Sequence, residues 1–186
     1  LRSDHALRKV PGEGAAILAL EPLDEALARG AVPLAEVLGY AMNADADEFE
    51  KPCLDPRNLS VCCRQALARS GIAPDEVDLL VWAPQGNSPD NKTLDALRAL
   101  FGPDLLGIPL VTSTFNTGYA ESASILLSLV AALSALRLDG TLWPQATGES
   151  WIDKRALSRP VRHILAIGST DIGINSALVL HAGDPR

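Results

Sequence analysis

The fold is indicated by residues 77–82, Val-Asp-Leu-Leu-Val-Trp, and by the segments on either side of this run. The run is almost entirely apolar instead of alternating, which is typical of a strand buried on both faces in a layered α/β protein. Asp55-Pro56 before it and Ser88-Pro89 after it each have the form of a helix start, a capping residue followed by proline. The sequence therefore predicts flanking helices, the first ending at Gly71 and the second at Gly102.

The rest of the chain repeats this alternation of short apolar runs and helical spacing. A helix is expected from Pro22 to Gly30, and another from about Thr117 to Leu138. The second is apolar nearly all round, so we expect it to be central. Strands are expected at 14–20, 33–40, 109–113, 161–167 and 175–181, the last two forming a hairpin around residues 169–173. This order predicts a layered α/β protein.

Composition and charge exclude several classes of function. The 186 residues include 16 basic and 23 acidic side chains, giving a net charge of −7, and contain no run of Lys or Arg. Neither a nucleic-acid module nor a polybasic membrane anchor is therefore indicated. The uncharged apolar stretch 122–136 would span about 22 Å as a helix at ~1.5 Å per residue, short of the ~30 Å hydrocarbon core. We expect a globular protein without a membrane segment.

The cysteines support neither a metal site nor a disulfide framework. Cys53, Cys62 and Cys63 are odd in number and lack Cys-x-x-Cys spacing, and His5, His163 and His181 are scattered. We therefore expect no metal, no cofactor and a reducing, cytoplasmic location. Cys62 and Cys63 are expected to pack on the buried face of a helix.

Several segments resemble, in order, the β-ketoacyl synthases of the thiolase-like superfamily. Gly12-Glu13-Gly14-Ala15, Ala66–Ile72 and Asn175–Leu180 carry the resemblance. It implies an α/β fold with thiolase-like α-β-α-β-α layers, here the C-terminal half plus the last two strands of the N-terminal half. Residues 1–45 would then end the N-terminal half, 46–56 would form a linker and 57–186 the C-terminal half. The chain begins Leu1-Arg2 without Met, and we expect an upstream part to be missing.

The motifs that carry catalysis in this family are altered. Residues 84–89 read Pro-Gln-Gly-Asn-Ser-Pro where the family has His-Gly-Thr-Gly-Thr-Pro, and residues 113–119 read Ser-Thr-Phe-Asn-Thr-Gly-Tyr where it has Thr-Lys-Ser-x-Thr-Gly-His. The resemblance implies degenerate catalytic positions at Pro84, Thr114 and Tyr119. It also implies an acyl pocket lined by polar residues from these stretches and from the turn at 169–173, namely Gln85, Asn87, Asn116, Thr117, Ser169, Thr170 and Asp171.

These replacements predict the loss of ordinary condensation chemistry. Decarboxylative condensation requires a thiolate that carries the acyl chain and imidazoles that donate hydrogen bonds to the thioester oxygen and the developing enolate. Pro84 has no donor, and Tyr119, with an ordinary pKa of ~10, is a poor proton shuttle near neutral pH. Removing one such donor typically costs ~10²–10³ in rate. Each position also has a structural interpretation, because proline can simply end a strand and Tyr119 can pack as an aromatic.

Three hypotheses follow. The first is a catalytically degenerate subunit that resembles a chain-length factor and pairs as a heterodimer with an active ketosynthase, in fatty-acid or polyketide synthesis on acyl carrier protein. The second is an active acyl-transferring or hydrolytic enzyme that uses Tyr119, Asn116 or Asp171 with a nucleophile from the N-terminal half. The third is a structural module without an acyl ligand. In each case we expect association with the N-terminal half as a separate chain or fragment, because strands 14–20 and 33–40 alone would be marginal in water.

Overall fold

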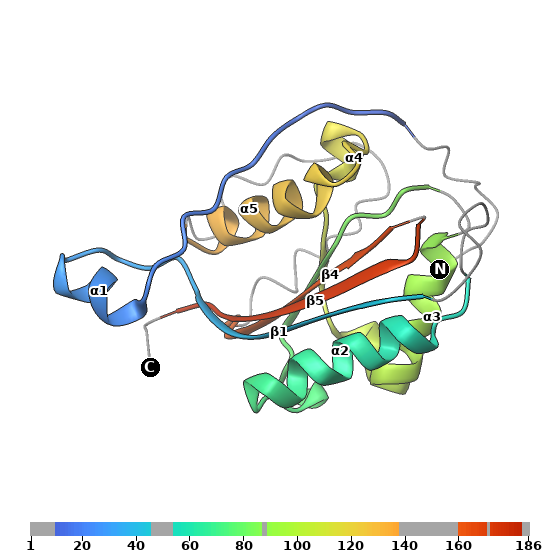
Figure 1. The fold of residues 1–186 in the computed structure, drawn as a ribbon, viewed down its shortest axis with the longest axis horizontal. Coiled ribbons are helices and arrows are strands. Elements are labelled where there is room, and N and C mark those ends of the chain that lie inside the picture. The colour runs from blue at the N-terminus through green and yellow to red at the C-terminus, as the bar shows by residue number, and fades with distance from the viewer. Residues whose placement is uncertain (1–9, 46–53, 87–88, 138–159, 171, 184–186) are drawn as a thin grey trace.

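The fold is a mixed five-stranded sheet with helices on both faces, in a computed structural model that describes residues 10–45, 54–86, 89–137, 160–170 and 172–183 (Figure 1). The strand order is β1-β5-β4-β2-β3. Strands β2, β3 and β4 run parallel, and β5 is antiparallel to both β1 and β4. The strands are β1 (Glu36–Ala44), β2 (Leu79–Trp82), β3 (Leu110–Val111), β4 (His163–Ser169) and β5 (Ile174–His181).

Helices α2 and α3 pack on one face of the sheet and α5 on the other (Figure 1). All four residues of β2 are buried, and they alternate between the two cores, Leu80 facing α2 and α3 while Leu79 and Val81 face α5. This confirms the predicted burial on both faces. The helices are α1 (Leu23–Ala28), α2 (Arg57–Ser70), α3 (Pro89–Phe101), α4 (Thr114–Thr117) and α5 (Ala123–Arg137), with 3₁₀ turns η1 (Pro74–Glu76) and η2 (Gly102–Gly107).

Most predicted boundaries are confirmed where a cap or a turn residue marks them. Helix α2 begins directly after Pro56, where the Asp55 carboxylate accepts the Arg57 backbone N–H at 2.9 Å. It ends at Gly71, whose φ of 70° is the left-handed conformation that favours glycine. The predicted hairpin is also present, with β4 and β5 in register from His163↔His181 to Ser169↔Asn175.

The strand predicted at 14–20 is absent. This segment runs past α4 and α5 without strand structure, and the isolated bridge between Pro11 and Tyr119 lies before it in the chain. Ile17 and Leu20 are 91% and 78% exposed. The physical reason is that a strand requires a hydrogen-bonding neighbour, and no strand of the described chain lies beside residues 14–20.

The strand predicted at 33–40 forms, but its extent and its place in the fold differ from the prediction. It covers Glu36–Ala44 and pairs with β5 from Glu36↔His181 to Ala44↔Ile174. Placing this strand in the sheet of a separate half was therefore wrong, because its backbone partners belong to the same sheet as β2, β3 and β4. The proposed linker at 46–56 lies largely outside the described residues and stays a prediction.

The long apolar helix predicted from Thr117 is interrupted. Helices α4 and α5 are separated by residues 118–122, beginning at Gly118 with a φ of 70°. The chain near Gly12 passes so close that a Cβ on Gly12 would lie 2.0 Å from the Thr117 carbonyl oxygen. A tertiary contact, invisible to helical periodicity, thus accompanies the break.

Candidate functional site

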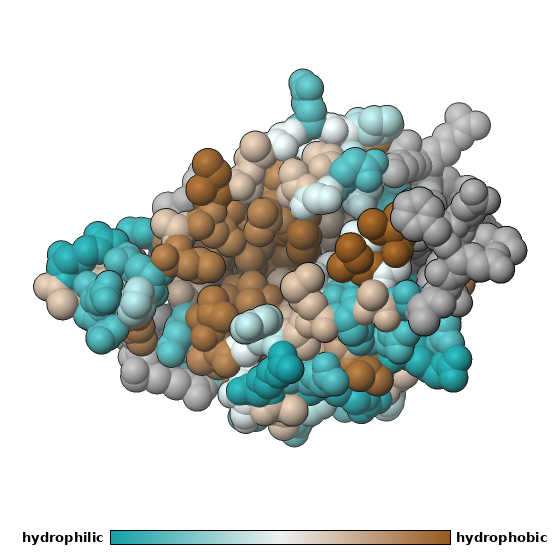
Figure 2. All heavy atoms as spheres, in the orientation of Figure 1, coloured by the Kyte–Doolittle hydropathy of each residue, from teal (hydrophilic) through white to brown (hydrophobic). Residues whose placement is uncertain are grey.

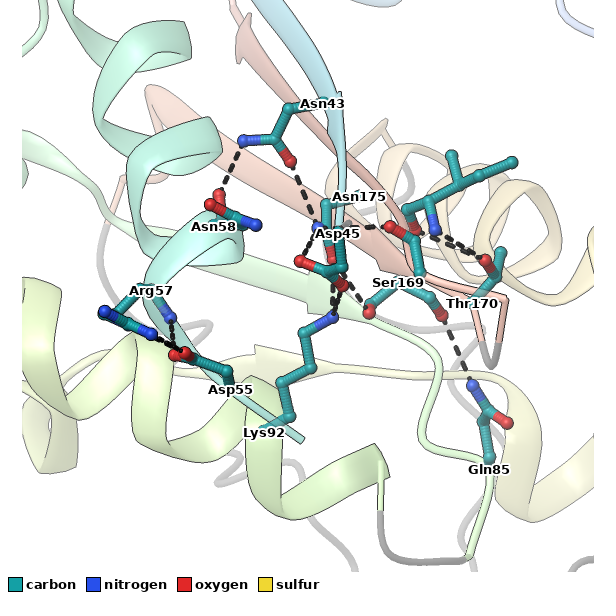
Figure 3. Close-up of polar contacts among 12 residues, drawn as sticks. Asn43, Asp45, Asp55, Arg57, Asn58, Gln85, Lys92, Ser169, Thr170 and Asn175 are labelled. Atoms are coloured by element: carbon teal, nitrogen blue, oxygen red, sulfur yellow. Dashed lines mark hydrogen bonds and ion pairs between the residues drawn. The ribbon is translucent and has the colours of Figure 1, made fainter. Parts of the chain in front are cut away.

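The predicted site residues follow the carboxyl ends of the three parallel strands. Pairing of Trp82 with Ile167 and of Val81 with Val111 aligns the ends of β2, β4 and β3. Residues 84–86, 169–170 and 112–114 therefore lie at one edge of the sheet. A direct contact joins two of the segments, since the Gln85 side-chain Nε2 donates to the Ser169 carbonyl oxygen at 3.3 Å (Figure 3).

The three degenerate positions differ in their surroundings. Pro84 and Thr114 are buried, and Tyr119 is half-buried. The Thr114 backbone N–H donates to Thr112 Oγ1 at 3.2 Å, and the two threonine hydroxyls lie 3.0 Å apart. Tyr119 is held by its backbone, which donates to the Val10 carbonyl at 2.7 Å. Among these side chains only hydroxyl groups carry donors, and Pro84 carries none.

The predicted pocket-lining residues are only partly gathered. Gln85, Ser169 and Thr170 lie together at the sheet edge, with Gln85 buried. Asn116 is exposed on α4, and Thr117 Oγ1 donates to the Ser113 carbonyl at 3.0 Å. Asn87 and Asp171 lie outside the described residues. An acyl pocket at this edge thus stays a prediction.

Asp90 fixes the loop between β2 and α3. Its two carboxylate oxygens accept the backbone N–H groups of Gln85 at 2.8 Å and of Gly86 at 2.7 Å. Gly86 has a φ of 79°, so the loop turns through the conformation that glycine tolerates best. Asp90 therefore fixes the backbone of Gln85, and the hydrogen bond to Ser169 fixes its side chain.

A buried polar cluster beside this edge was missed by the sequence analysis. Lys92 from α3 forms an ion pair with Asp45 at the end of β1, and their side chains are 1% and 2% exposed. The Lys92 ammonium also donates to Asn175 Oδ1 at 3.0 Å, and Asn175 is fully buried at the start of β5 (Figure 3). Asn175 Nδ2 in turn donates to Asp45 Oδ1 and to Asn43 Oδ1, each at 3.1 Å.

Helical spacing was the signal that could have located Lys92. Lys92 lies four residues before Ala96, on the face of α3 that also buries Thr93, Leu97 and Leu100. A lysine on a buried face needs an anionic partner, because an unpaired charge there is costly. The identity of that partner, Asp45, could not be found from spacing.

The cluster keeps Asp45 ionised. Burial alone would raise the pKa of Asp45, but hydrogen bonds from Lys92, Asn58 and Asn175 and the positive charge of Lys92 hold it below its ordinary value. The Asp45 backbone N–H donates to the Gly173 carbonyl at 2.8 Å. The Asp45 backbone is therefore bonded to the β4–β5 turn, and Ser169 Oγ, which donates to Asn175 Oδ1 at 3.1 Å, extends the network of the Asp45 side chain.

The two described histidines lie at the opposite end of the sheet. His163 begins β4 and faces His181 at the end of β5, with ring centroids 5.5 Å apart. Six residue steps along β4 separate His163 from Ser169, about 20 Å at ~3.3 Å per residue. Within the described ranges, no imidazole lies at the candidate edge; His5 is outside them.

Cys62 and Cys63 pack as predicted, and Cys53 lies outside the described residues. Cys62 and Cys63 lie buried on α2 in the core beneath the sheet. Burial raises the pKa of Cys62 to about 11 and of Cys63 to about 12, so neither thiol is ionised near neutral pH. In the part of the chain that the structure describes, no set of three His, Cys, Asp or Glu side chains is arranged to hold a metal, and no helix is long and apolar enough to cross a bilayer.

Comparisons with known proteins agree with this geometry. Residues 34–148 match the model of the "Beta-ketoacyl synthase, C-terminal domain" family. The chain is 33% identical over 165 residues to 3-oxoacyl-[acyl-carrier-protein] synthase II, chloroplastic, of Arabidopsis thaliana, covering 85% of this chain and 30% of that protein. It is 30% identical over 128 residues to 3-oxoacyl-[acyl-carrier-protein] synthase 2 of Rhizobium meliloti (strain 1021), covering 69% of this chain and 30% of that protein.

A solved structure described as the ishigamide ketosynthase/chain length factor aligns with a TM-score of 0.77 at 26% identity. The alignment covers 98% of this chain and 48% of that one, so the chain spans less than half of its relatives. The sheet order, the motif-bearing edge and the match over residues 34–148 together show that the chain belongs to the β-ketoacyl synthase family, as its C-terminal domain.

Proposed function

We propose that this chain is a catalytically degenerate ketosynthase-like subunit of the chain-length-factor type. In this proposal it pairs with an active ketosynthase in fatty-acid or polyketide synthesis on acyl carrier protein. The observation that carries it is the absence of histidine from the motif stretches 84–89 and 113–119, where the resemblance puts Pro84 and Tyr119 in the place of imidazoles, while His163 and His181 lie at the far end of the sheet. The likeness to a structure described as a ketosynthase/chain length factor supports it.

The groups at the candidate edge suit binding better than proton transfer. Thr112, Thr114 and Gln85 present neutral hydroxyl and amide groups, which hydrogen-bond a carbonyl without titrating near neutral pH. The Asp90 carboxylate already accepts two backbone N–H groups. A wall of this kind can orient a growing acyl or polyketide chain while the companion subunit supplies the nucleophile and the imidazoles.

An uncovered apolar face supports association with a complementary N-terminal half, whether separate chain or fragment. Figure 2 shows hydrophobic side chains gathered over α5 and toward β1. Five strands ~4.8 Å apart span about 19 Å, and one helix ~10 Å wide covers about half of that width. Helix α5 packs on β2, β3 and β4, which leaves β1 with Val37 43%, Tyr40 63% and Met42 66% exposed.

The segment at 14–20 fits the same partner. Its backbone has no ladder, and Ile17 and Leu20 are exposed. We propose that these residues become a strand when the complementary half supplies a neighbouring strand. An extended apolar segment without a neighbour is costly in water and is well suited to β-augmentation.

The test uses the purified complex with a companion ketosynthase and acyl- and malonyl-loaded carrier protein. Intact-mass spectrometry should find the acyl group on the companion and none on this chain. Acylation of this chain would overturn the proposal in favour of an active enzyme. A carrier-protein product pattern that is identical with and without this chain would favour the structural module.

A matched variant sharpens this test. The single substitutions Pro84→His and Tyr119→His each restore one imidazole to the edge. In the proposal neither substitution leads to acylation of this chain, because no nucleophile is added. Acylation of either variant would contradict the proposal.

A cytoplasmic location stays a prediction, testable by fractionation.

A further inference from the structure

Lys92 occupies an unusual place for a lysine. Its side chain is 1% exposed and its ammonium contacts Asp45 and Asn175. Replacing a buried ion pair with apolar residues of similar volume is often neutral or stabilising, so packing alone would be served as well by leucine or methionine. Packing therefore does not explain why a charged side chain is buried at position 92, and we look for its role in the positions of the neighbouring polar groups.

The hydrogen bonds of the cluster lead from Lys92 to the candidate edge along two routes. On the first, Asp45, the ion-pair partner of Lys92, donates its backbone N–H to the Gly173 carbonyl at 2.8 Å. On the second, Asn175 Oδ1 accepts from Lys92 at 3.0 Å and from Ser169 Oγ at 3.1 Å. The Ser169 carbonyl then accepts from Gln85 (Figure 3). Both ends of the β4–β5 turn are thus joined to Lys92.

The Lys92 ammonium also fixes which way the Asn175 amide points. Because Lys92 is a donor only, it selects the Asn175 oxygen and leaves Nδ2 to donate to Asp45 and Asn43. The Asp45 carboxylate, an acceptor only, selects the same orientation from the other side, so the ion pair as a whole fixes the amide. When both charges are removed the amide can rotate, and Ser169 Oγ then loses its acceptor. The turn is in close contact with the same groups, since a Cβ on Gly173 would lie 3.2 Å from Asp45 Cβ.

We propose that Lys92 is a positioning residue: its ammonium orders Asp45 and Asn175, and through them it holds Thr170, Gly173, Ser169 and Gln85 in one arrangement that limits the length of the acyl chain at this edge. The role in chain length rests on the proposed function, whereas the ordering of the turn depends on the cluster alone. The inference therefore has two separable consequences.

Hydrogen exchange tests the ordering of the turn in the full chain, without any partner. The reporters are the backbone amides of Thr170, Gly173 and Ile174, which are bonded within the turn, and of Asp45. Lys92→Met should speed their exchange at least ~10-fold relative to the amides of β2. Asp95→Asn, a matched change in an exposed ion pair on the same helix, should leave them unchanged.

A second variant guards against misfolding. Lys92→Met combined with Asp45→Asn removes both charges together, so no uncompensated buried charge remains. It should unfold at a denaturant concentration close to that of the wild type and still show the faster turn exchange. Slow, wild-type exchange of the turn amides in the folded double variant would overturn the positioning role.

Product analysis tests the second consequence. With the companion ketosynthase and carrier protein, the double variant should broaden the distribution of product lengths, while Asp95→Asn keeps the wild-type distribution. Faster turn exchange with an unchanged product distribution would overturn the control of chain length and leave the ordering role. If the wild-type chain itself has no effect on the companion's products, the proposed function fails, and the exchange experiment still decides the role of Lys92.

Discussion

The Gln85 side-chain amide donates to the carbonyl oxygen of Ser169 at 3.3 Å, joining residues 84 positions apart at the ends of β2 and β4. The altered stretch after β2 therefore touches the altered turn after β4. Asp90 holds the Gln85 backbone from one side, and Asn175 receives the Ser169 hydroxyl from the other. The sheet edge that carries the altered motif stretches is therefore held together by hydrogen bonds between polar groups, as the proposed binding role expects.

Gly173→Ala should destabilise the protein by about 1–2 kcal/mol. Gly173 has a φ of 82°, and an added Cβ would lie 3.2 Å from Asp45 Cβ, so both strain and crowding act. Urea unfolding followed by circular dichroism measures the change. Gly107→Ala is the control, because a Cβ there meets nothing within 4 Å and no left-handed φ is involved. Equal stability of the two variants would contradict the prediction.

Asp45→Asn should destabilise the protein by about 3–5 kcal/mol at pH 7, the usual effect of breaking a buried ion pair. The pKa of Asp45 is lowered in the folded state, so the stability from its ionised form is present above the ordinary carboxyl value near 4 and is lost as pH falls through the folded value. The gap between wild type and variant should therefore narrow below about pH 4.

Denaturant unfolding at several pH values checks the effect of Asp45→Asn. Asp95→Asn removes an exposed carboxylate from the same region and should change stability by less than ~1 kcal/mol at every pH. A gap for Asp45→Asn that stays constant down to pH 3 would show that the charge of Asp45 is not the stabilising element.

Met42→Lys should prevent association with the complementary half and leave the fold intact. Met42 is 66% exposed on the side of β1 away from α2, so the lysine is tolerated in the isolated chain but charges the uncovered face. Light scattering after size exclusion of the two co-expressed halves measures the assembly. Val61→Lys, at a 45% exposed position on α2, should leave the assembled mass unchanged.

Two outcomes would count against the interface. If the Met42→Lys chain assembles at the wild-type mass, β1 is not part of the interface. Loss of assembly with Val61→Lys would place the contact on the α2 face instead.

Cys62 and Cys63 should resist alkylation in the folded protein. Burial raises the pKa of each thiol well above neutral, to about 11 and about 12, and closes access to reagent. Peptide mass spectrometry after iodoacetamide treatment at pH 8 should find both unmodified in the native state and both modified in urea. Rapid native labelling would show that α2 opens from the sheet.

Local signals in the sequence identified much of the fold because they depend only on near neighbours. The cap and proline before α2, the glycine at its end and the apolar run of β2 each specify an element without reference to the rest of the chain. The prediction failed for the strand at 14–20, for the sheet to which the strand at 33–40 was assigned, and for the helix from Thr117, which is interrupted. A strand is defined by its hydrogen-bond partner, and periodicity does not say which partner is available.

The candidate site likewise has one part that the sequence predicted and one part that it did not. Motif positions located Pro84, Gln85 and Thr114, and strand order then explained why they share an edge. The Lys92–Asp45–Asn175 cluster was not predicted, because its members come from three separate segments and are joined only by side chains. No spacing along the chain carries that information.

The sequence by itself determined the α/β class and the two ends of α2, since these depend on residue type and short-range geometry. Only the tertiary structure decided that β1 joins the sheet of β4 and β5, that residues 14–20 remain without a strand partner, and that a lysine is buried beside the altered edge. Those features depend on contacts between distant segments, whose free energy is gained only when the whole sheet has assembled.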